Sequence, residues 1–228
     1  GIAPHADSQV RFDSNRTALL LEVGTDAIDL RAIDPSGAAV DSLRIPAHDR
    51  SLLESIPLPV LRMPQIDIAG GNEVEQIFVH RASPTRVEFS VVFRDESHPG
   101  RVLGLGLFDL GYDAYRAHIY RGLWDVETFA YRYARPQDVA GGSPVAIDFP
   151  STYSGSQVYD VWVAEHHSRE VPIGAFEWVD GRPVIHVDTW NHMFAERGTN
   201  PGLATEDVKN PSRRVGDRAA AEALLGRP

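Results

Sequence analysis

The sequence predicts a mainly β protein, an antiparallel sandwich or barrel-like sheet of about ten short strands. Short segments bounded by turn residues recur from Thr17 to Asp188, and in the segment Thr85–Arg94 every second residue is apolar. Strong helix formers gather only near the C-terminus. These three observations favour strands for most of the chain and little helix.

The predicted strands follow one another, with turns such as Pro35-Ser36-Gly37 and Asp180-Gly181 between them. They cover Thr17–Val23, Ala27–Ile33, Ala38–Ile45, Val74–Arg81, Thr85–Arg94, Arg101–Leu110, Ala114–Arg121, Trp124–Tyr133, Pro144–Phe149, Val158–Glu165, Val171–Val179 and Pro183–Asp188.

Two helices are expected. The first lies near residues 48–56, where Ser51 and Glu54 have capping-box spacing and Pro57 ends the run. The second lies near residues 213–225, an alanine-rich segment followed by Gly226. Thr189–Glu196 is a candidate for one further short helix, and residues 57–69, with three prolines, are expected to be extended.

Length and composition predict a single domain over residues 1–228, with 1–16 as a tail and 198–228 as a C-terminal extension that carries the helix. The chain has no cysteine, which excludes disulfides and thiolate metal sites. Its net charge of −10 argues against a nucleic-acid partner, and no apolar run is long enough for a membrane-spanning helix.

Nucleotide and flavin cofactors are not expected, because no glycine-rich phosphate-binding motif opens a helix. The chain begins with Gly1 rather than Met, like a processed end. This favours a secreted or periplasmic protein, as an expectation.

One candidate site is a predicted hairpin over residues 113–133. A two-residue turn at Gly122-Leu123 would place His118 opposite Glu127, close enough for a hydrogen bond that orients the imidazole. Acid–base roles are then predicted for His118, Glu127 and Tyr120, and ligand binding for Arg116 and Tyr131. The alternative is an ordinary solvated sheet face, because a one-residue shift in register removes the pattern.

The second candidate site lies in residues 165–192, which contain four of the nine histidines. With the Asp180-Gly181 turn, one face of the hairpin carries Phe176, Trp178, Ile185 and Val187 and is predicted to be core. The other face places His186 near Glu177 and Asp188, an acid–base set.

The loops at the same end of this hairpin carry further ligand-type side chains. His166, His167, Glu170 and His192 would converge with Asp188, and imidazole with carboxylate is a zinc-type ligand set. A divalent metal is therefore a candidate cofactor, and a polar rim with scattered histidines is the alternative.

These residues favour an enzyme of the hydrolase or lyase type, cofactor-independent or metal-assisted, that acts on a polar small molecule or a glycan. A non-catalytic ligand- or glycan-binding module is the first alternative, with aromatic residues such as Trp190 as contacts. A structural or assembly protein is the second alternative.

Overall fold

The computed structural model describes residues 18–23, 27–46, 50–96, 114, 118, 124–161 and 164–225. The chain divides into two compact units, Gly1–Arg50 and Ser51–Pro228, where the sequence predicts one domain. Each unit is built around its own β-sheet.

The first unit contains a three-stranded antiparallel sheet in the order β1-β2-β3, made of β1 (Ala18–Val23), β2 (Ala27–Ile33) and β3 (Ala39–Pro46). The turn between β2 and β3 is closed by Asp34, whose carboxylate accepts hydrogen bonds from the backbone N–H groups of Ser36 at 2.8 Å and Ala38 at 3.0 Å. This side chain acts as the turn's internal cap. The three strands confirm the sequence prediction to within a residue or two.

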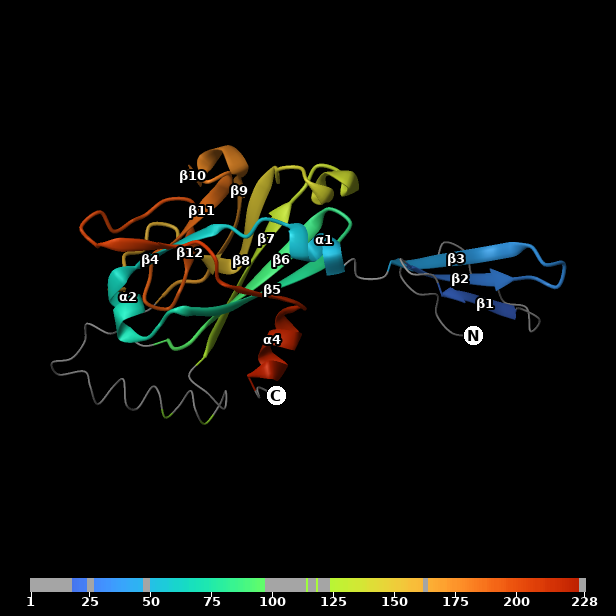
Figure 1. The fold of residues 1–228 in the computed structure, drawn as a ribbon, viewed down its shortest axis with the longest axis horizontal. Coiled ribbons are helices and arrows are strands. Elements are labelled where there is room, and N and C mark those ends of the chain that lie inside the picture. The colour runs from blue at the N-terminus through green and yellow to red at the C-terminus, as the bar shows by residue number, and fades with distance from the viewer. Residues whose placement is uncertain are drawn as a thin grey trace. The chain divides into compact units, whose positions relative to one another are not determined.

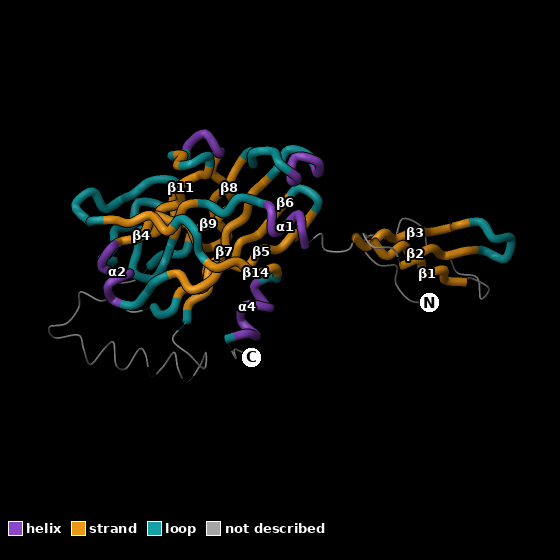
Figure 2. Tube along the Cα trace, viewed as in Figure 1, coloured by secondary structure: helices purple, strands orange, loops and turns teal. Residues whose placement is uncertain are grey.

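The second unit is a single curled sheet (Figures 1 and 2). Its main path runs β13-β4-β11-β12-β8-β7-β6-β5-β14, with β10 paired to β11 and β9 to β8. The strands are β4 (Val60–Pro64), β5 (Val74–Ser83), β6 (Arg86–Phe93), β7 (Asp125–Arg132), β8 (Ala146–Tyr153), β9 (His167–Pro172), β10 (Trp178–Val179), β11 (Arg182–Val187), β12 (Phe194–Ala195), β13 (Thr205–Val208) and β14 (Ser212–Val215).

The protein is mainly β as predicted, but the large sheet is mixed rather than antiparallel. β4 runs parallel to β11, β12 parallel to β8, and β14 parallel to β5. Each of these pairs joins segments far apart in sequence, so the local alternation that identifies a strand carries no information about its partner's direction. The expectation of an antiparallel sandwich or barrel-like sheet is therefore wrong in the direction of these three pairs, although the sheet is curled.

The helices are short. α1 (Arg50–Ser55) confirms the helix predicted near 48–56, and α2 (Gln65–Gly70) follows β4 within the segment expected to be extended. The helix predicted over 213–225 is only partly present, because α4 spans Arg218–Leu224 and is preceded by β14. The Asp217 carboxylate sets the start of α4 by accepting a hydrogen bond from the N–H of Ala220 at 2.8 Å.

Two further expectations fail in the described residues. Thr189–Glu196 forms a turn followed by β12 instead of a helix. The described part of the predicted strand Val158–Glu165 is irregular, and the next strand, β9, begins at His167. The predicted strand Arg101–Leu110 lies outside the described residues.

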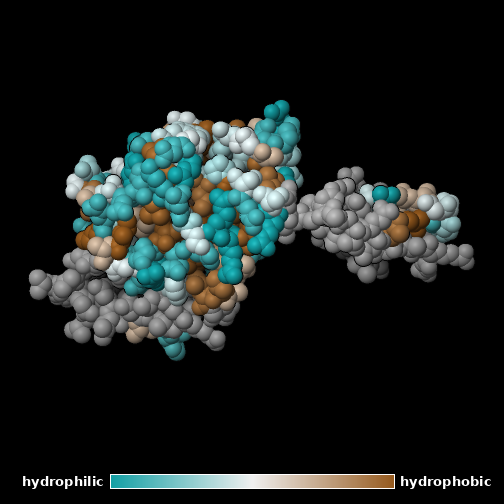
Figure 3. All heavy atoms as spheres, in the orientation of Figure 1, coloured by the Kyte–Doolittle hydropathy of each residue, from teal (hydrophilic) through white to brown (hydrophobic). Residues whose placement is uncertain are grey.

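The main core lies on one face of the large sheet. The alternating residues of β6 (Val87, Phe89, Val91 and Phe93) are all buried in it, as the period-two pattern predicts. Where α4 covers the other face, a smaller cluster forms from Phe78, Val92, Val126 and Ala221. Figure 3 shows polar side chains over much of the visible surface of this unit, with apolar ones between them.

No helix in the described part of the chain is both long and apolar enough to cross a membrane.

The hairpin before Asp188 has the predicted register, with Val179 opposite Arg182 and Trp178 opposite Pro183. Its first strand is interrupted by the 3-10 helix η2 (Ile173–Ala175), so only β10 pairs. Phe176, Ile185 and Val187 are buried as predicted, whereas Trp178 is 42% exposed. Trp178 was expected in the core, and the expectation is wrong because the chain turns through η2 before reaching this short edge strand.

This difference predicts unequal costs for two truncations. Phe176→Ala should lower the free energy of unfolding by about 3–5 kcal/mol, because it leaves a cavity in a packed core. Trp178→Ala should cost less than about half of that, because much of the indole is already in water. Urea denaturation of both variants measures the difference, and equal costs would show that Trp178 is packed as deeply as Phe176.

Candidate functional site

Charged side chains form a row across three neighbouring strands. Asp207 on β13 lies opposite Arg62 on β4, and Arg62 lies opposite His186 on β11. The Arg62 guanidinium donates to Asp207 at 2.7 Å (Nε to Oδ1) and to Glu177 at 2.6 Å (Nη1 to Oε2). Glu177 is thus held by Arg62, and its charge also acts on His186.

His186 is half-buried, and its surroundings favour the neutral imidazole. Burial lowers the pKa of His186 below its usual value, and the positive charge of Arg62 lowers it further. The carboxylates of Glu177, Asp207 and Glu196 oppose this change without reversing it. A neutral imidazole at pH 7 is able to accept a proton.

The backbone at Gly198 passes close to the His186 ring. A Cβ atom added at Gly198 would lie 3.0 Å from Nδ1 of His186, closer than most real contacts allow. Glycine therefore permits this approach, which restricts the imidazole's movement on one side.

Asp188 lies two residues beyond His186 and is 3% exposed. Its carboxylate accepts hydrogen bonds from the Ser154 hydroxyl and from the Thr199 N–H, both at 3.2 Å. Burial nevertheless raises the pKa of Asp188 to about 6, and the charge of Glu196 contributes in the same direction. Asp188 therefore exchanges its proton close to neutral pH.

Glu196 acts electrostatically on both Asp188 and His186. Its Oε2 atom accepts a hydrogen bond from the Tyr153 hydroxyl at 2.9 Å. Arg169 donates to the same hydroxyl at 2.8 Å, and its guanidinium carbon lies 5.0 Å from the centre of the Tyr153 ring. We refer to His186, Asp188, Glu196, Tyr153 and Arg169 as the Asp188 cluster.

The turn from Asp188 to Met193 is buried throughout. The N–H of Asp188 donates to the carbonyl of Met193 at 2.9 Å, which closes the turn. His192 has a φ of 63°, a strained value for a residue with a side chain. Its Nδ1 lies 3.0 Å from Asp125 Oδ2, and its ring stacks on Phe93 with centroids 3.8 Å apart. These contacts fix the turn, and with it Asp188, to β6 and β7.

The predicted metal ligands are not brought together. His166 Nδ1 lies 2.9 Å from the Ser151 carbonyl, His167 Nε2 lies 3.4 Å from Glu165, and Glu170 lies 3.8 Å from Arg132. His192 is used by the buried turn. In the described ranges, no three histidine, aspartate or glutamate side chains form a group able to hold a metal ion.

The predicted hairpin over 113–133 is not formed as expected. Arg116 and Tyr120 lie outside the described residues, whereas Ala114 and His118 are helical and exposed. Glu127 lies on β7 opposite Val91 of β6. Tyr131, expected on the polar face, is buried in the main core, because both faces of β7 are packed.

Trp190 was expected to contact a ligand, but it is only 9% exposed and its indole N–H donates to the Val161 carbonyl at 2.8 Å. Conversely, sequence reasoning missed Glu196, Tyr153 and Ser154. Tyr153 reaches the site through the parallel pairing of β8 with β12, for which the local sequence has no signal. Glu196 is the last residue of the predicted helix Thr189–Glu196. The nearest residue that is typical of a loop is Gly198, two positions later.

No protein-family model, curated protein or solved structure matches the chain.

The raised pKa of Asp188 predicts a pH-dependent stability. The folded protein holds this proton more tightly than the unfolded chain, whose aspartate has a pKa near 3.8. Stability from this group is therefore full below about pH 4 and is lost as the pH rises through about 6. The loss should be on the order of 3 kcal/mol.

Asp188→Asn should remove this pH dependence, so that the variant gains stability relative to the parent between pH 4 and pH 7. Urea denaturation at several pH values gives the difference. Asp180→Asn, at an exposed turn position, is the matched control and should follow the parent. A constant difference between Asp188→Asn and the parent would contradict the assignment.

Proposed function

We propose that the protein is an enzyme that performs acid–base chemistry on a polar substrate at the Asp188 cluster. The observation that carries the proposal is a carboxyl group whose pKa is raised to about 6, two residues from a histidine whose pKa is lowered, with the charge of Glu196 acting on both. Groups whose pKa values are shifted by burial and by a specific charged neighbour are candidates for acid–base catalysis.

In this proposal, His186 is the base. It is half-buried, whereas Asp188 is almost fully buried, so the substrate meets the imidazole first. His186 takes a proton from a water molecule or from an acidic C–H bond of the substrate. Asp188, in its protonated form, is the acid that supplies a proton to the leaving oxygen, and the charge of Glu196 acts on both His186 and Asp188.

The cationic side chains at the rim favour a substrate with hydroxyl or carboxylate groups. Arg169 and Arg197 are both exposed, and Arg197 Nε lies 4.0 Å from Glu196 Oε1. Arginine forms paired hydrogen bonds with carboxylates and binds planar anionic groups well. This supports hydrolysis or elimination on an acidic or hydroxyl-rich molecule, such as a uronate-containing glycan.

The proposal predicts a bell-shaped dependence of rate on pH, since His186 must lose a proton and Asp188 must keep one. The rate should decline as the pH rises through the Asp188 pKa of about 6, and it should decline again as the pH falls below the lowered pKa of His186. Chromogenic glycosides test for hydrolysis, and the ultraviolet absorbance of unsaturated products from uronate polysaccharides tests for elimination. His186→Gln and Asp188→Asn should each lower kcat about 10²–10⁴-fold.

His166→Gln is the control, because this exposed histidine lies outside the Asp188 cluster and should leave the rate unchanged. If His186→Gln folds and keeps the parent's kcat on a substrate that the parent turns over, His186 is not the base.

A further inference from the structure

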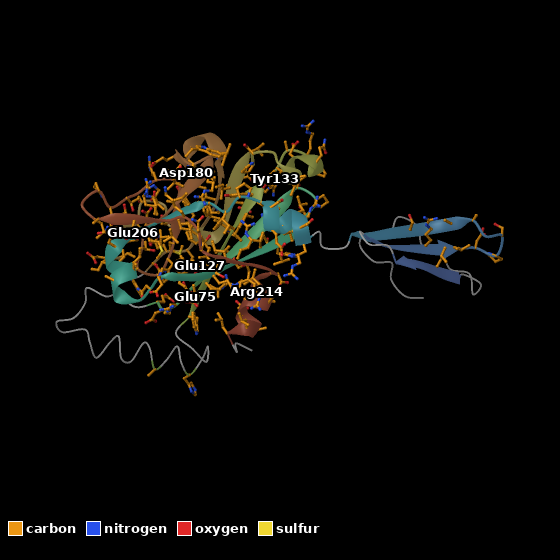
Figure 4. The ribbon with its side chains drawn as sticks, viewed as in Figure 1. Glu75, Glu127, Tyr133, Asp180, Glu206 and Arg214 are labelled. Carbon is orange, nitrogen blue, oxygen red and sulfur yellow. The ribbon has the colours of Figure 1, made fainter. Side chains whose placement is uncertain are left out.

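A cavity of about 360 Å³ lies at the end of the sheet where β10 turns into β11. Three aromatic side chains line it: Tyr131, Tyr133 and Trp178. The rest of the wall comes from residues 55–57, the loop 139–144, Gly181 and Pro183. Figure 4 shows Tyr133 and Asp180, the neighbour of Gly181, at the same end of this unit. Both the volume and the aromatic lining are typical of small-molecule sites.

Among the residues that line this cavity, Tyr131 is unusual because its hydroxyl is buried. The side chain is 2% exposed, and its hydroxyl oxygen has no hydrogen-bond partner in the part of the chain that the structure describes. Burial raises the pKa of Tyr131 well above its usual value, so the group remains a hydroxyl and a donor. A buried donor without an acceptor is unfavourable, and proteins rarely keep one without a reason.

Two arginines act on this hydroxyl. Burial and the neighbouring Tyr133 raise the pKa of Tyr131, whereas the positive charges of Arg182 and Arg213 partly oppose them. Arg213 is fixed in place, because it donates to the Ile56 carbonyl at 2.7 Å and to the Leu53 carbonyl at 3.3 Å. A hydroxyl donor in a positive field is suited to an acceptor oxygen.

Trp178 provides the opposite kind of contact. Its indole is 42% exposed on a strand of only two residues, an unusual position for so large an apolar side chain. A planar ring that enters the cavity would cover the exposed indole and stack on it.

We propose that this cavity binds a small, planar, largely apolar molecule that carries a carbonyl or similar acceptor oxygen, and that the Tyr131 hydroxyl donates to that oxygen. The cavity is distinct from the Asp188 cluster. Pro183 and Asp188 are five residues apart along β11 and its exit, about 17 Å at the usual strand rise.

The test compares two probes of nearly equal size: coumarin, which has a carbonyl, and naphthalene, which has none. Isothermal titration calorimetry should show that the protein binds coumarin more tightly. Tyr131→Phe, which removes only the hydroxyl, should weaken coumarin binding about tenfold and leave naphthalene binding unchanged. Tyr133→Phe is the matched control on the same wall and should keep the parent's preference. Amide shifts at Gly141, Gly142 and Gly181 in NMR spectra should locate the probe.

The ligand-free variant provides an independent readout. Since Tyr131→Phe removes a hydroxyl without a partner, its urea midpoint should equal or exceed that of the parent. A lower midpoint would show that the hydroxyl already has a partner in the protein and would overturn the proposal. Equal binding of both probes by the parent, or no binding of either, would overturn it as well.

Discussion

The arrangement of polar groups in the second unit depends on the burial of the turn from Asp188 to Met193. A buried turn must satisfy its own backbone, and here the Asp188 N–H, the Met193 N–H and the His192 N–H all find acceptors within the turn, at 2.9–3.0 Å. This geometry requires the left-handed conformation at His192, and the contacts of its ring with Asp125 and Phe93 hold it. The strained conformation of His192 thereby fixes the Asp188 carboxyl group within the sheet.

Burial of Asp188 opposes stability and at the same time raises the pKa of its carboxyl group. Two hydrogen bonds to the carboxylate favour its charged form, yet burial and the charge of Glu196 outweigh them. The result is a carboxyl group that is poorly solvated when charged but able to exchange a proton near pH 6. Such a group is costly in a purely structural core, where an amide or an apolar residue would be more stable.

Sequence reasoning located features that depend on neighbours in the chain and missed those that depend on distant pairing. The alternation in β6, the boundaries of β2 and the register at Asp180-Gly181 are local properties, and each was predicted. His186 was placed near Glu177 for the same reason. Glu196 and Tyr153 reach the Asp188 cluster only because β12 runs parallel to β8, and alternation along one strand does not specify this pairing.

The error at β7 has a different cause. Acidic and aromatic residues share one face of this strand, where Asp125 and Glu127 are followed by Phe129 and Tyr131, and both faces are packed, one by the main core and the other under α4. In a strand buried on both faces, the pattern cannot indicate which face is the interior, so Tyr131 was assigned to the polar side. The hydroxyl of Tyr131 makes that residue suitable for either environment, and only the fold shows that it is buried. Its position in the core, with a donor that nothing in the described chain accepts, is what makes it a candidate ligand contact.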